Sequence, residues 1–176
     1  MSPHRAERPH AAHPSLVRCT VLGNIPVFAH PEPAQQVIEL WRRMQEERRI
    51  TVFGYLLIDD RAELLASADD LPREVRRFLD ASSDAILRWL ESSESRGLLR
   101  NLKRFQDPAA TGAARLWQRD TAIEPVLSRE AMLAALERLH RGPVQRGYVD
   151  DATLYRYSSA RNYAGQPGLI SVTTEW

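Results

Sequence analysis

The stretch 51–67, TVFGYLLIDDRAELLAS, decides the fold. Two apolar runs rich in strand-forming residues flank its charged centre, DDRA at 59–62. Apolar runs joined by a short polar turn are typical of a β-hairpin. Because turns favour Asp, a tip that faces water is the simplest interpretation, and a cation site built from carboxylate oxygens is the alternative. The carboxylates concerned are Asp59, Asp60 and Glu63.

Outward from this hairpin, the sequence alternates between strand and helix patterns. Upstream, 15–28 is rich in β-branched residues and predicts a strand, and apolar residues at helical spacing predict an amphipathic helix over 33–48. Downstream, the pattern predicts a helix or helical hairpin over 70–93 that continues to 105, an irregular edge strand over 115–127, and a helix from Ser128 to a stop at Gly142-Pro143. No regular structure is predicted over 144–165.

This order of elements predicts an α+β fold of the ferredoxin-like split βαβ type. Such a fold has an antiparallel sheet with helices on one face. A chain of 176 residues is the size of one ordinary domain. We expect a disordered tail over 1–14, one domain over 15–165 with an enlarged helical insert at about 70–105, and a C-terminal tail over 166–176.

Composition limits the functional class. The hydrophobic share is 43% and the charged share 27%, and no apolar run approaches the roughly 20 residues that a membrane span needs. The lone Cys19 excludes an intrachain disulfide and a cysteine metal site, so we expect a reducing, cytoplasmic location with no membrane contact. The tail residues His4, His10 and His13 are too irregularly spaced to indicate a site.

Basic residues are concentrated in one segment, although the net charge is only +1. Between 96 and 119 there are six cations and a single acid, Asp107, which is a density that a phosphate backbone favours. A solvated helix face is the alternative. Trp117 adds a ring on which an unpaired base can stack, or is a plain core residue. The candidate nucleic-acid-binding residues are Arg100, Lys103, Arg104, Arg115, Trp117, Gln118 and Arg119.

Four segments in series resemble a known family. They are 20–60, beginning TVLGNIPVF and ending LLIDD, then LWQRD at 116–120, ALERLHRGPVQRGYVDD at 135–151, and LYRYSSARNYAG at 154–165. In order and spacing they resemble the small single-tyrosine insertion-sequence transposases, especially the REP-associated tyrosine transposases. The resemblance covers roughly 16–165, and it implies a DNA-binding protein that recognises imperfect hairpins and commonly acts as a dimer.

The same resemblance implies that the catalytic positions have changed. The family holds Mg²⁺ or Mn²⁺ with two His residues at the hairpin, where this chain has Arg61 and Glu63. Its nucleophilic Tyr corresponds to Arg138, and a polar residue one helical turn later corresponds to Gly142. Guanidinium offers no lone pair to a cation, so no catalytic residue, metal site or cofactor is expected. A replacement nucleophile among Tyr148, Tyr155, Tyr157 and Tyr163, or a catalytic His140, is the less favoured alternative.

The resulting hypothesis is a transposase-derived protein that binds structured single-stranded DNA or RNA, such as a hairpin, and lacks strand-transfer activity. An active transposase or nickase of the same family is the first alternative. The second is a scaffold that recruits a protein partner through the helical insert. A homodimer is a further expectation that the resemblance implies.

Overall fold

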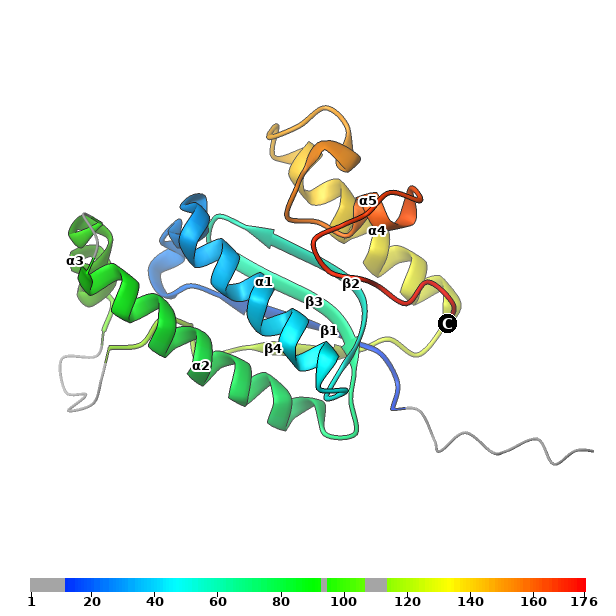
Figure 1. The fold of residues 1–176 in the computed structure, drawn as a ribbon, viewed down its shortest axis with the longest axis horizontal. Coiled ribbons are helices and arrows are strands. Elements are labelled where there is room, and N and C mark those ends of the chain that lie inside the picture. The colour runs from blue at the N-terminus through cyan, green and yellow to red at the C-terminus, as the bar shows by residue number, and fades with distance from the viewer. Residues whose placement is uncertain (1–11, 93–94, 107–113) are drawn as a thin grey trace, which may run out of the picture.

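The computed structural model describes residues 12–92, 95–106 and 114–176. The strands are β1 (Ser15–Thr20), β2 (Thr51–Ile58), β3 (Arg61–Ser67) and β4 (Ala122–Pro125); the α-helices are α1 (Pro31–Glu46), α2 (Leu71–Ser92), α3 (Arg96–Arg104), α4 (Arg129–Gln145) and α5 (Ala160–Tyr163). The strands form one antiparallel sheet in the order β2-β3-β1-β4 (Figure 1). This order, with α1 between β1 and β2, confirms the predicted α+β fold of split βαβ type.

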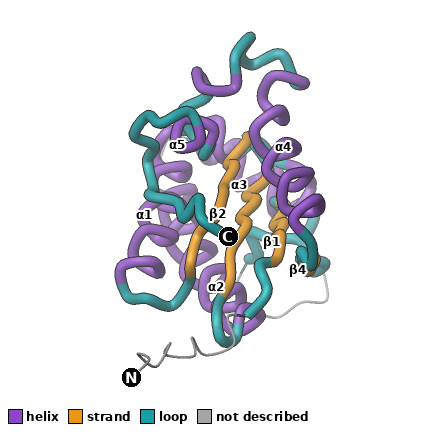
Figure 2. Tube along the Cα trace, turned by 90° about the vertical axis from the view of Figure 1, so that its right-hand side faces the viewer, coloured by secondary structure: helices purple, strands orange, loops and turns teal. Residues whose placement is uncertain are grey.

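Helices cover both faces of the sheet, whereas helices on one face were expected. Figure 2 shows the sheet between α1 on one side and α4 on the other. Alternate residues of β2 explain this arrangement, because Tyr55 and Leu57 belong to the core beneath α1 and α2, and Leu56 and Ile58 to a second core beneath α4. A strand that is apolar at successive positions needs cover on both sides.

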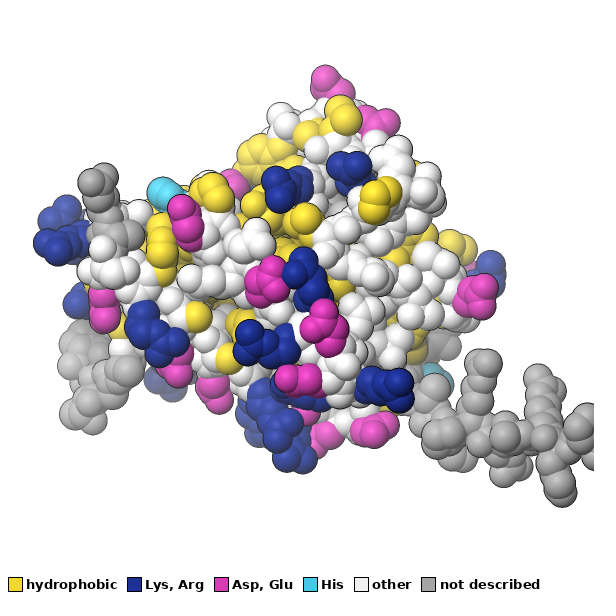
Figure 3. Space-filling model, viewed as in Figure 1, with side chains coloured by type: hydrophobic (Ala, Val, Ile, Leu, Met, Phe, Trp, Pro, Cys, Tyr) yellow, Lys and Arg dark blue, Asp and Glu magenta, His cyan; other side chains and the backbone are white. Residues whose placement is uncertain are grey.

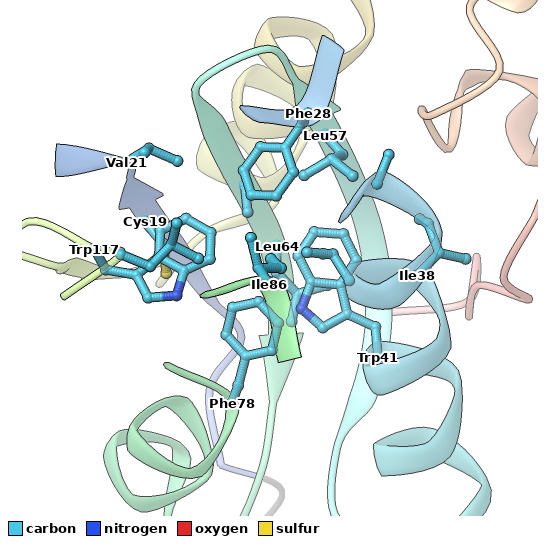
Figure 4. Packing of buried hydrophobic residues seen from close by; sticks show 14 of the residues in the cluster. Cys19, Val21, Phe28, Ile38, Trp41, Leu57, Leu64, Phe78, Ile86 and Trp117 are labelled. Carbon is cyan, nitrogen blue, oxygen red and sulfur yellow. The ribbon is translucent and has the colours of Figure 1, made fainter. Parts of the chain in front are cut away.

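The larger core is built around aromatic side chains. Trp41 of α1 and Phe78 of α2 lie with their ring centroids 5.7 Å apart, and Phe78 contacts Trp117 at 5.9 Å (Figure 4). On the opposite face α4 approaches the sheet closely at Gly54, where an added Cβ would lie 2.8 Å from Leu136 Cδ2. The close approach explains why this strand tolerates a glycine.

Two element boundaries differ from the prediction. The hairpin turn is shorter, because Arg61 already pairs with Ile58 as the first residue of β3. Helix α4 does not stop at Gly142-Pro143 but continues to Gln145. Pro143 lies one turn from the helix end, where its missing N–H removes a single hydrogen bond, and the helix ends before Gly147, which has a positive φ of 73°.

The terminal segments are partly ordered on the domain. Of the predicted tail 1–14, residues 1–11 lie outside the described part of the chain, and the Pro14 carbonyl accepts a hydrogen bond from Val126 N at 2.8 Å. The expected tail 166–176 packs against the sheet, since Ile170 is 2% exposed and Thr173 N donates to Val52 O. Within the described ranges, no helix has the length and apolar character that crossing a membrane requires.

Candidate nucleic-acid interface

The carboxylates at the hairpin tip are engaged by other segments, so the expected solvated tip is wrong. Asp60 is 8% exposed and accepts a hydrogen bond from Asn24 Nδ2 at 2.9 Å. Its other oxygen lies 3.9 Å from Arg146 Nη1. Asp59 accepts a 2.5 Å hydrogen bond from the Tyr148 hydroxyl. The tip therefore joins the loop after β1 to the end of α4.

Beside the tip, five charged residues form what we call the sheet-face cluster, on the side of the sheet that α4 covers. Its members are Arg18, Arg61, Glu63, Glu124 and Arg138. Glu63 is 7% exposed and lies between two guanidinium groups, 3.7 Å from Arg18 Nε and 3.6 Å from Arg61 Nη1. Glu124 also lies between two guanidinium groups, with its carboxylate oxygens 3.6 Å from Arg18 Nη1 and 3.8 Å from Arg138 Nη2. These distances are those of ion pairs rather than of hydrogen bonds.

The sheet-face cluster does not fit a divalent cation. Glu63 is neutralised by two arginines, and the guanidinium of Arg61 has no lone pair to donate. Gly142 supplies no ligand, and a Cβ there would lie 3.0 Å from Leu56 Cδ2. In the described parts of the chain no three His, Cys, Asp or Glu side chains gather as a metal site would require.

Three of the four tyrosine hydroxyls considered as replacement nucleophiles, those of Tyr148, Tyr155 and Tyr163, are held in structural hydrogen bonds. Tyr155 donates to Leu57 O at 3.1 Å and Tyr163 to Phe53 O at 2.8 Å. Burial raises the pKa of both phenols, and the hydrogen bond to Asp59 raises the pKa of Tyr148. A raised pKa keeps each hydroxyl protonated, which opposes its use as a nucleophile.

His140 serves to hold the chain beyond α4 in place. Its Nε2 lies 2.9 Å from Ser159 Oγ, and its ring packs on Tyr163 with centroids 5.2 Å apart. The same Ser159 hydroxyl accepts a hydrogen bond from Tyr55 N, so the histidine helps to hold this segment on the edge of β2. Burial lowers the pKa of His140 to about 4, which leaves the ring neutral at pH 7.

Helix α3 carries the exposed cations. Arg100, Lys103 and Arg104 are all exposed, and none of the ion pairs within the described residues includes them. Figure 3 shows basic side chains at the end of the molecule that α3 forms. The apolar residues Leu99 and Leu102 face the core, so the opposite side of the helix is left for these charges.

The predicted stacking residue Trp117 is a core residue, which corrects its assignment to the nucleic-acid interface. It is 4% exposed, and its Nε1 donates to the buried Ser82 hydroxyl at 2.9 Å. Neighbouring Arg115 is half-buried and donates to the Trp117 carbonyl at 3.3 Å. A ring enclosed in this way offers no face to a base.

One loop, at 22–24, lies between the two segments that carry the remaining predicted residues. Gln118 Nε2 donates to Val21 O at 3.3 Å, immediately before the turn at 22–24, and Arg119 follows it on the surface. From the other side, the ring of Phe105 at the end of α3 lies directly over Gly23. We call the polar residues on both sides of this loop the basic rim; they are Arg100, Lys103, Arg104, Arg115, Gln118 and Arg119.

Phe105 is a surface residue that the sequence pattern did not predict. It continues the apolar stripe of α3, which predicts burial, yet 54% of it is exposed. The available signal was its position after Lys103-Arg104 at the end of the helix, where the stripe no longer faces the core.

Comparison with known proteins identifies a structural neighbour. No protein-family model matches the chain, and no curated protein matches it. A solved structure described as "Structure of the REP associates tyrosine transposase bound to a REP hairpin" superposes with a TM-score of 0.60, over 100% of this chain and 94% of that chain, at 9% sequence identity. At this identity the likeness establishes the fold, so the protein has a transposase-like fold.

Proposed function

We propose that this protein binds structured single-stranded nucleic acid, such as a DNA or RNA hairpin, and lacks strand-transfer activity. The three exposed cations on α3, which form no ion pair with another described residue, carry the proposal, because such cations can neutralise phosphates without first breaking an ion pair. The fold of a protein solved in complex with a REP hairpin supports the same class of ligand.

The sheet-face cluster supports the absence of strand transfer. The positions that the family resemblance assigns to metal ligands, Arg61 and Glu63, are joined by an ion pair, and the position assigned to the nucleophile is Arg138. The two guanidinium groups beside Glu63 would also repel a divalent cation, which opposes the use of this carboxylate as a metal ligand.

Fluorescence anisotropy with labelled DNA and RNA hairpins tests the proposal, starting at low salt, where phosphate contacts are strongest. The variant Arg100→Ala/Lys103→Ala/Arg104→Ala is expected to lose affinity and to reduce the slope of log K against log salt by about 3. The matched control is Arg73→Ala/Arg76→Ala/Arg88→Ala, which removes the same charge from exposed positions of α2.

Equal losses in the two variants would show that net charge, rather than α3, determines binding. Absence of affinity in the wild type at low salt would overturn the proposal and favour the scaffold alternative, which requires a partner protein that copurifies after nuclease treatment. A homodimer, a partner at the helical insert α2–α3 and a cytoplasmic location stay predictions. Light scattering of the free and hairpin-bound protein tests the first of these.

A further inference from the structure

Phe105 is an exposed aromatic side chain in a fixed position. It forms the C-cap of α3, with its backbone N–H bonded to Leu102 O. One side of its ring lies against Gly23, where an added Cβ would be 2.3 Å from Cδ2 and 2.5 Å from Cε2. Gly23 has a φ of 68°, which favours glycine, and the absence of a Cβ lets the backbone lie directly against the ring.

The surroundings of the ring are basic. Lys103 and Arg104 immediately precede Phe105, Arg100 lies one turn earlier on α3, and none of them has an ion-pair partner within the described chain. A hydrophobic ring that is more than half exposed to water is unfavourable, and covering it with a ligand would lower the free energy. Such a ring beside free cations matches a ligand with both planar bases and phosphates.

We propose that Phe105 is a stacking platform for one unpaired base of the bound nucleic acid. The inference rests on the proposed function and specifies it, since it requires a ligand with an unstacked base rather than an uninterrupted duplex. Gly23 supports the ring from below, the base covers its exposed part, and the cations of α3 bind the adjoining phosphates.

Other aromatic side chains are less suited to this role. Trp117 is enclosed in the core. Tyr148 is 45% exposed, but its hydroxyl is bonded to Asp59 and its ring already packs on Tyr155, with centroids 6.2 Å apart. Two further carboxylates follow it at Asp150 and Asp151, which would repel a phosphate backbone.

The test separates base stacking from charge by changing the ligand and the protein together. One hairpin carries a short unpaired flank with bases, and a second carries the same flank as abasic residues, so that the number of phosphates is unchanged. Both are made as DNA and as RNA. The proteins are the wild type, Phe105→Leu, Phe105→Trp and Gly23→Ala, with Leu133→Ala as a control at another exposed apolar position on α4.

The wild type is expected to bind the flank with bases roughly tenfold more tightly than the abasic flank, as stacking of one base predicts. Phe105→Leu should abolish that ratio, Phe105→Trp should keep it, and Gly23→Ala should reduce it by displacing the ring without a change of charge. Leu133→Ala should bind as the wild type does. Circular dichroism of each variant shows whether it is folded.

Two results would overturn the inference in different ways. If the wild type binds both flanks equally, or Phe105→Leu keeps the wild-type ratio, then Phe105 does not stack and the proposed function stands. If the wild type binds neither hairpin at low salt, the proposed function fails and the inference with it.

Discussion

Glu63 is the residue that determines the character of the sheet-face cluster. A carboxylate that is 7% exposed on a central strand needs compensation, and two guanidinium groups within 4 Å provide it. The pairing also restrains Arg18 and Arg61, which are each little more than one-quarter exposed. The cluster therefore stabilises the side of the sheet beneath α4 by mutual neutralisation.

Replacement of Glu63 by Gln should lower the free energy of unfolding by about 1–3 kcal/mol, because two partly buried arginines would lose their shared counter-charge. Urea denaturation at neutral pH measures this. The matched control is Glu137→Gln, which breaks the exposed ion pair between Glu137 and Arg141 and should cost less than about 0.5 kcal/mol. Equal costs for the two variants would mean that the Glu63 ion pairs contribute no more than a surface pair.

His140 gives the protein a pH dependence of known sign. Its pKa is about 4 in the folded chain, below the ordinary value of 6.5, so between these values the unfolded chain binds more protons. The free energy of unfolding should therefore fall as the pH decreases from 6.5 to 4, by about 2–3 kcal/mol from this residue. In His140→Gln this part of the slope should be missing from urea titrations across the range. An identical slope in both proteins would contradict the neutral, buried histidine.

At the scale of elements, the sequence predicts what depends on local pattern and misses what depends on neighbours. The hairpin, α1 and the long helical insert follow from periodicity and turn residues, and so does the order of strands. The burial of Asp60 does not, because it depends on Asn24 and Arg146, which are remote in sequence. Trp117 and Phe105 show the same limit. Trp117 is buried and Phe105 is exposed, and both outcomes depend on how α2 and α3 pack against the sheet.

The segment 166–176 should behave as part of the domain. A chain that ends at 165 would lose Ile170 from the core and the hydrogen bond from Leu169 N to the Tyr55 hydroxyl, so we expect unfolding to cost about 2–4 kcal/mol less. Removal of 174–176 alone keeps both contacts and should cost less than about 1 kcal/mol. Urea denaturation of the two truncated proteins distinguishes the cases. Unchanged stability in the longer truncation would restore the interpretation of a detached tail.

At the scale of the whole molecule, the residues on the α4 side of the sheet and those of the proposed binding surface lie in different regions. The α4 side holds the sheet-face cluster, whose charges are already paired, and Tyr155 and Tyr163, whose hydroxyls are already hydrogen-bonded. The basic rim lies around the loop at 22–24, where the end of α3 and the segment 115–119 approach the residues that follow β1. Affinity and chemistry would thus depend on different regions of the molecule, and each can be measured without the other.

The chain as a whole should bind a hairpin without forming a covalent bond to it. With Mg²⁺ or Mn²⁺ and single-stranded hairpin DNA, we expect no protein–DNA adduct on a denaturing gel, because Arg61 cannot bind a cation and the Tyr148, Tyr155 and Tyr163 hydroxyls keep their protons. Anisotropy on the same samples shows that the DNA was bound. An adduct would establish the nickase alternative, and its loss in a single Tyr→Phe variant would identify the nucleophile.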